Sequence, residues 1–131
     1  MFALCSFVLL NPSANATSNY EYKPDEYVVI ENGLSPDGMY SIAAHGEGDL
    51  GYENFHLYLM DAKSGKKIGP LTEVKDVLDT KADAIGAVWS KDSHQVSIGY
   101  RVDRRVVAHI IYHIENGRAK KIKGPTKVPA R

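Results

Sequence analysis

Short runs of alternating apolar residues, separated by strong turn sequences, constrain this fold more than any other feature of the chain. Ser35-Pro36-Asp37-Gly38 combines a proline that presets a turn, an aspartate that caps it and a glycine that supplies positive φ. Such turns recur about every 8 to 15 residues, a spacing typical of β-hairpins. The sequence therefore predicts an all-β antiparallel meander, with strands over 27–30, 39–44, 55–60, 66–68, 95–102, 106–114 and 118–122.

Three stretches outside these strands have different patterns. Leucine and valine recur at helical spacing within 71–84, which predicts one or two helical turns there. Residues 45–54 are rich in glycine and acidic side chains and are expected to form a loop. The tail 123–131 contains two prolines and several basic residues, and we expect it to fray.

The first residues have the pattern of a targeting segment. Residues 2–10 are apolar and uncharged, a break follows at Pro12, and Ala14-Asn15-Ala16 places small residues at alternate positions. This order is typical of a cleaved secretory signal and predicts a signal peptide over 1–16. The mature chain 17–131 is then a single β domain in the periplasm or outside the cell. No Lys or Arg precedes the apolar run, and a buried N-terminal strand is the alternative interpretation.

Charge and cysteine content exclude several classes of protein. The chain has 16 basic and 16 acidic side chains and no net charge, which argues against nucleic-acid binding by bulk positive charge. Cys5 is the single cysteine, so a disulfide scaffold and a cysteine-rich zinc module are both excluded. The apolar run 2–10 is far shorter than the roughly 20 residues of a membrane-spanning helix, and we expect no transmembrane span.

The two halves of the chain form an internal repeat. The sequence Leu34-Ser35-Pro36-Asp37-Gly38 matches Trp89-Ser90-Lys91-Asp92-Ser93, and Gly69-Pro70 matches Gly124-Pro125, each at an offset of 55 positions. Between these anchors, each half contains strands, a polar loop and a short Lys-Lys-Ile strand. The first copy spans about 34–71 and the second about 89–125.

The repeat resembles the blade signature of TolB-type β-propellers, in which an apolar or Trp residue precedes Ser-Pro-Asp-Gly and a strand. A later strand in that unit ends in an Asp-x-x-x-Gly turn, which Asp61-Ala62-Lys63-Ser64-Gly65 matches. A closed propeller needs at least four blades, and this chain has two copies. The resemblance therefore implies two blade-like repeats packed as a small sandwich or partial propeller, or a homo-oligomer of several chains. As a whole the chain resembles small exported bacterial proteins.

The loop after residue 44 concentrates groups that bind metals. Calcium prefers six to eight oxygen ligands on a flexible loop. The predicted ligands are Glu47, Asp49, Glu53 and Asn54. His45 and His56 with one carboxylate would form an alternative zinc site. The remaining interpretation is a solvated loop whose glycines serve turn geometry.

Basic residues near the C-terminus suggest a docking point for anions. Arg101, Arg104 and Arg105 flank Asp103 at a predicted hairpin tip, where they either bind an anionic partner or form a local ion pair. The stretch from residue 118 onward has basic residues and no acid, as a segment that touches anionic lipid or a cell-wall polymer would have. A solvated tail is the alternative.

Several other side chains are assigned structural roles. His109 and His113 are expected on the outer face of one strand, about 13 Å apart and too distant to share a metal. Trp89, as the opening residue of the second repeat, is expected to be a core anchor. Ile98, Leu57 and Leu59 are expected to be buried.

Together these patterns favour an exported, non-enzymatic binding or interaction module, whose partner is a protein or a component of the cell envelope. The alternative is a metal-dependent or carboxylate hydrolase that uses the loop 45–56. Fold alone does not choose between them.

Overall fold

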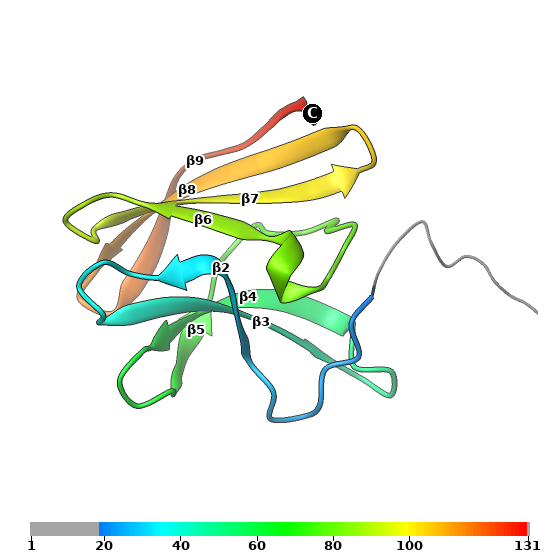
Figure 1. Ribbon diagram of the computed structural model, residues 1–131, viewed down its shortest axis with the longest axis horizontal. Coiled ribbons are helices and arrows are strands. Elements are labelled where there is room, and N and C mark those ends of the chain that lie inside the picture. Colours follow the sequence, from blue (N-terminus) through cyan, green and yellow to red (C-terminus); the bar gives the residue numbers. More distant parts are fainter. Residues whose placement is uncertain (1–18, 131) are drawn as a thin grey trace, which may run out of the picture.

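A computed structural model describes residues 19–130 as a single curled β-sheet of eight strands (Figure 1). The predicted signal peptide lies outside these residues. The strand order is β5-β4-β3-β2-β6-β7-β8-β9, so consecutive strands are neighbours in the sheet except β5 and β6, because β6 pairs with β2. The all-β antiparallel meander is therefore confirmed. The strands are β2 (Val28–Leu34), β3 (Tyr40–Glu47), β4 (Glu53–Asp61), β5 (Lys67–Pro70), β6 (Gly86–Trp89), β7 (Gln95–Asp103), β8 (Val106–Glu115) and β9 (Arg118–Pro129).

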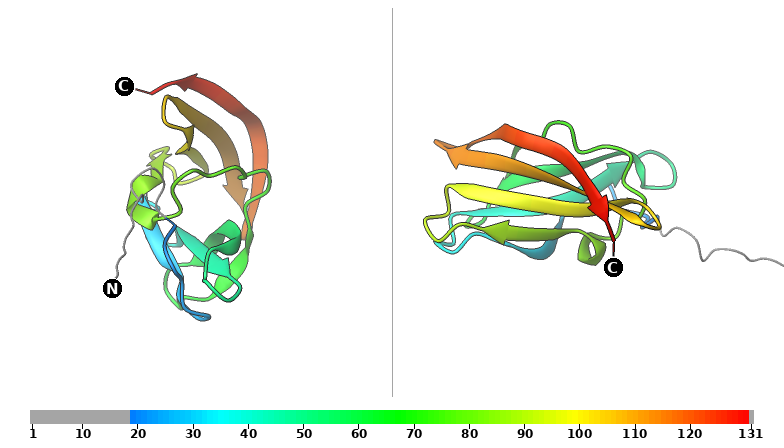
Figure 2. Two further views of the ribbon diagram at one scale, coloured as in Figure 1. Left: turned by 90° about the vertical axis from the view of Figure 1, so that its right-hand side faces the viewer. Right: turned by 90° about the horizontal axis from the view of Figure 1, so that it is seen from above.

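The sheet consists of two four-stranded antiparallel meanders, β2–β5 and β6–β9. They meet where β2 and β6 run parallel, with Glu31 opposite Gly86. The Glu31 amide donates to Ile85 O at 3.0 Å across this seam. The sheet curls into a half-barrel, as the left view of Figure 2 shows.

The main core lies on the concave face of the half-barrel because alternate residues of each strand point to one side, and Ala43, Tyr58 and Met60 form a second, smaller buried cluster. On β7 and β8 this gives a regular alternation of buried and partly exposed residues. Ile98, Leu57 and Leu59 are at most 2% exposed, as predicted. The prediction that Trp89 is a core anchor is wrong, because the side chain is only partly buried and packs against the core without belonging to it. Its indole Nε1 is buried without a hydrogen-bond partner among the described residues.

The open side of the half-barrel is covered by residues 71–81, here called the crossing segment, which connects β5 to the second half (Figure 2). Leu71 and Val74 are 1% and 5% exposed and belong to the main core. Two buried tyrosines hold the segment: Tyr22 Oη donates to Thr80 O at 2.6 Å, and Tyr112 Oη donates to Thr72 O.

The helical turns predicted within 71–84 are wrong except for a short 3₁₀ turn at Ala82–Ala84. Glu73 and Asp76 have φ of 67° and 59°, which interrupts a right-handed helix. The apolar spacing has another cause, because Leu71 and Val74 are buried from an irregular segment.

Several strands run further than the sequence predicts, including β2, which continues to Leu34 rather than ending at residue 30. β3 continues to Glu47 and β4 begins at Glu53, so the predicted loop 45–54 is reduced to a short turn between them. β9 continues to Pro129, where fraying is predicted. It is held by β8, with Val107 opposite Val128 and Ala108 opposite Lys127.

Candidate functional site

The acidic residues of the predicted calcium site lie at the tip of the β3–β4 hairpin. Glu47 and Glu53 are cross-strand partners. The Asn54 side-chain amide donates to Glu47 Oε1 at 3.4 Å. Asp49 is exposed in the turn, and the Glu53 carboxylate lies so close over Gly48 that a side chain there would collide with it. The hairpin thus brings Glu47, Glu53 and Asn54 near one another and leaves Asp49 at the tip.

Within residues 19–130, no three His, Cys, Asp or Glu side chains are placed so that they could hold a metal ion. The calcium site stays a prediction, which melting curves with calcium and with a chelator would test. The hydrolase alternative depends on the same hairpin, and no observation on the described residues favours it over a binding role.

His45, predicted to lie in the loop, is a buried residue of β3. It is 1% exposed, and its Nδ1 lies 2.6 Å from Glu26 O. The Tyr27 ring stacks on the imidazole with 4.0 Å between ring centroids. His56 stands opposite His45 on β4, with its Nδ1 3.0 Å from Asn54 O. One nitrogen of each imidazole therefore lies at a backbone carbonyl, and the burial and ring stacking of His45 indicate a structural role for that residue.

The glycines of the hairpin allow the backbone of the segment before β2 to approach closely. Gly51 has φ of 81°, and a Cβ atom there would collide with the Tyr22 backbone. The Tyr22 amide donates to Gly51 O at 3.0 Å. Gly46 is similarly close to the Gly51 carbonyl. Close backbone approach explains these glycines without a metal.

The predicted arginine tip is the β7–β8 hairpin turn. Arg101 Nη1 donates to Arg104 O at 2.7 Å, and the Arg105 amide donates to Asp103 Oδ1 at 2.7 Å. Asp103 therefore caps the turn, and none of the three arginines forms a salt bridge with a described residue. All three are exposed, so their charge is available to a partner.

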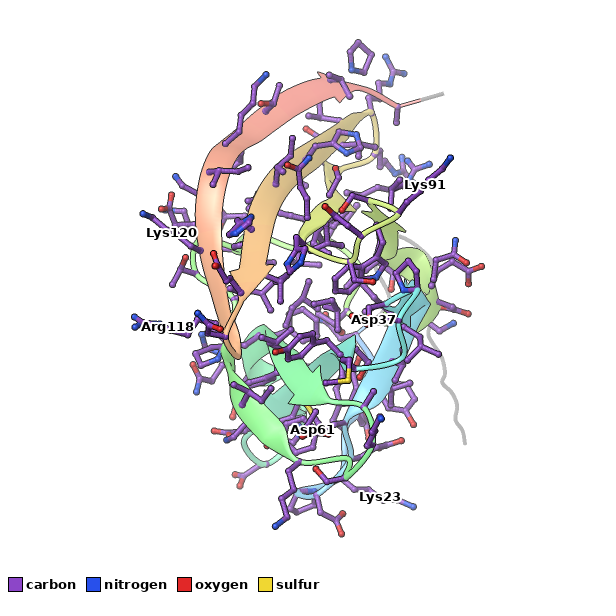
Figure 3. The ribbon with its side chains drawn as sticks, turned by 90° about the vertical axis from the view of Figure 1, so that its left-hand side faces the viewer. Lys23, Asp37, Asp61, Lys91, Arg118 and Lys120 are labelled. Atoms are coloured by element: carbon purple, nitrogen blue, oxygen red, sulfur yellow. The ribbon has the colours of Figure 1, made fainter. Side chains whose placement is uncertain are left out.

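The same half of the sheet carries further cations along β9. Lys120 and Lys123 stand opposite His113 and Ile111 of β8, so they share the outer face of the sheet. Figure 3 shows Arg118 and Lys120 pointing away from the body of the molecule. Lys121 differs, because its Nζ lies 2.9 Å from Glu73 and 3.0 Å from Gly124 O and so fastens β9 to the crossing segment.

The outer face of β8 is polar, as predicted. His109 and His113 alternate with Ile110, Tyr112 and Ile114, which are at most 1% exposed. His113 Nε2 lies 2.9 Å from Glu115 Oε1. A hollow of about 770 Å³ lies beside these residues and is lined by both signs of charge: Glu73, Glu115, Arg118, Lys120 and Lys121.

The zero net charge hides a separation of charge between the two halves. Residues 19–70, which form β2–β5 and the segment before them, contain nine carboxylates and four lysines. Residues 85–130, which form β6–β9, contain nine Lys or Arg and three carboxylates. Among the nine Lys or Arg of this second range, Lys121 alone forms a salt bridge with a described residue. Counting charge separately in each half would have revealed this feature in the sequence.

The two Ser-x-Asp turns adopt the same local structure. Ser35 Oγ donates to Asp37 Oδ1 at 2.7 Å, and Ser90 Oγ donates to Asp92 Oδ1 at 2.6 Å. Each aspartate also accepts a backbone amide two residues later, at 3.0 Å in both turns. The hydroxyl hydrogen bonds come first among the contacts that lower the pKa of Asp37 and of Asp92 below the usual range. The turns touch, since the Asp37 amide donates to Ser93 Oγ at 3.0 Å.

No described helix has the length and apolar character needed to span a membrane. Comparisons of the chain with protein-family models, curated proteins and solved structures found no match.

Proposed function

We propose that this chain is an exported, non-enzymatic binding module that docks an anionic partner through its basic half, residues 85–130. The observation that carries the proposal is the separation of charge. Eight of the nine basic residues in this range form no salt bridge with a described residue. Uncompensated cations on one side of a molecule attract anionic partners and accelerate their encounter.

Two groups of basic side chains would contribute to docking. One is the tip formed by Arg101, Arg104 and Arg105, and the other is the outer face of β9 with Lys120 and Lys123. Both belong to the second meander and are exposed. The acidic half supports specificity, because a nearby surface of opposite sign repels an anionic partner that docks in the wrong orientation.

Two expectations from the sequence belong to this proposal. The signal peptide 1–16 implies a mature N-terminus at Thr17 and a periplasmic or secreted location, which N-terminal sequencing of the protein from its host would test. The two meanders are further proposed to be blade-like copies of one unit. The matching hydrogen bonds of their Ser-x-Asp turns support this.

Dextran sulfate, a polyanion without a peptide backbone, is a suitable first probe. We expect the affinity to fall as salt rises, because binding releases counterions. Arg104→Glu with Arg105→Glu, and separately Lys120→Glu with Lys123→Glu, should each weaken binding. Lys63→Glu with Lys66→Glu makes the same change in net charge on the β4–β5 turn and should have little effect. Equal loss in all three variants would show a response to net charge alone and would contradict the proposal.

A further inference from the structure

The outer edge of β9 is unpaired in the described part of the chain. β9 is the last strand of the sheet and is 12 residues long, whereas β5 at the opposite edge has four residues and ends in Pro70. A strand at an edge presents backbone N–H and C=O groups that another extended segment can pair with. β9 is therefore the longer of the two edges at which a strand could be added.

The part of this edge best suited to pairing is Arg118 to Lys123. The β8–β9 register is regular from Arg118 to Lys121, and the first shift follows before Lys123. Beyond it, Pro125 lacks an amide hydrogen and ends the run of donors. A segment of about six residues could therefore pair along this edge, in keeping with the common length of a strand.

Most of the basic side chains along this edge form no salt bridge with a described residue. Lys120 and Lys123 lie on the outer face and are exposed, with Ile122, 52% exposed, between them in the sequence. Lys121 faces the other way and is held by Glu73. Acidic residues of an added strand would place their Cβ atoms about 4.5–5.5 Å from the Cβ atoms of the lysines on the same face, where opposite charges attract.

Resting on the proposed function, we propose that the anionic partner is an acidic, extended polypeptide segment that adds to the sheet as a strand beside β9. The two features act together, because the edge supplies backbone hydrogen bonds and the lysines select for acidic side chains. The same lysines repel a second copy of β9, as edge lysines commonly do. The lysines therefore disfavour pairing between two copies of β9 and leave the edge available to a partner of opposite charge.

The experiment compares two peptides of equal charge against the full chain. The first alternates Glu and Val over eight residues, and the second carries N-methyl groups on alternate amides so that one edge cannot donate hydrogen bonds. We expect N-methylation to weaken binding by about tenfold or more, since several hydrogen bonds are lost. Hydrogen exchange should show new protection of the amides in 118–124 with the first peptide only.

Charge variants test the side chains separately. Lys120→Glu with Lys123→Glu should weaken binding of the first peptide by about tenfold, because two attractive cross-strand pairs become repulsive. Lys63→Glu with Lys66→Glu is the matched control and should leave the affinity within about twofold.

The outcomes separate this inference from the proposed function. If both peptides bind equally, or if 118–124 gains no protection, strand addition is overturned while electrostatic docking stands. The same holds if dextran sulfate binds and neither peptide does. If neither the peptides nor dextran sulfate bind at low salt, both proposals fail.

Discussion

At the scale of single residues, aspartates and glycines determine the turns. Asp37 and Asp92 hold equivalent turns through hydrogen bonds that favour the ionised carboxylate. The sequence predicts the first of these turns from its Pro, Asp and Gly. The second is less evident because Ser93, at φ of 65°, occupies the position where the first turn has Gly38. At that position the Ser93 hydroxyl accepts a hydrogen bond from the Asp37 amide.

Acid should weaken these two turns. The pKa of each aspartate is lowered in the folded state from an ordinary value of 3.8, so the stabilisation is present above that value and is lost as pH falls through the folded pKa. Asp37→Asn with Asp92→Asn should therefore flatten the decrease in unfolding free energy below about pH 4. Urea unfolding between pH 2 and 7 measures this. Asp25→Asn, at an exposed position, is the control, and an equal flattening there would contradict the assignment.

The Gly51 contact gives a second prediction at this scale. Gly51→Ala places a methyl group against the Tyr22 backbone and should free the segment before β2, which limited proteolysis near Lys23 would detect. Gly65→Ala is a matched control, since Gly65 also has positive φ but open space around its Cβ position. Both variants bear the conformational cost, about 1 kcal/mol. Only Gly51→Ala should expose the N-terminal segment, and equal cleavage of both variants would refute the role given to Tyr22.

At the scale of elements, most strands are predictable from this sequence, but β6 and the connection between the halves are not. Buried and exposed residues alternate along β7 and β8 because one face of each strand is buried, and the same alternation of apolar and polar residues is visible in the sequence. The crossing segment also buries Leu71 and Val74, but their spacing imitates a helix. Its course depends on distant partners, Tyr22 and Tyr112, which no local pattern contains. The continuation of β3 through His45 to Glu47 is not evident from the sequence for a similar reason, since the neighbours of His45, Glu26 and Tyr27, come from another segment.

Burial of the crossing segment predicts that it contributes strongly to stability. Leu71→Ala should lower the unfolding free energy by about 2–5 kcal/mol, because it leaves a cavity under the segment. Ile68→Ala is a nearby control on β5, where the side chain is 42% exposed, and should cost well under half as much. Chemical denaturation of both variants measures the difference. Equal, small losses would indicate that the segment is not packed on the core.

At the scale of the whole molecule, the two meanders form one sheet, and the crossing segment packs on both of them. The parallel contact between β2 and β6 is short, with one residue pair. The crossing segment adds a second connection, because Tyr22 before the first meander and Tyr112 in the second both donate to it. The halves are therefore expected to unfold together even though their surface charges are opposite. The charge difference lies on the surface, where it is free to serve binding.

The packing of the crossing segment on the core should be lost in alkali. Burial raises the pKa of Tyr22 and of Tyr112 well above the ordinary value of 10.0, and burial also raises that of Tyr100. Their contribution to stability is complete below pH 10 and is lost as pH rises through the folded-state pKa, because only the unfolded chain ionises freely in that range. We expect cooperative unfolding above about pH 10, coincident with tyrosinate absorbance.

Tyr112→Phe should reduce the alkaline sensitivity and cost about 1–3 kcal/mol at neutral pH, because Thr72 O loses its donor. Titration of all eight tyrosines near pH 10 while the fold persists would show that the tyrosines under the crossing segment are accessible to solvent.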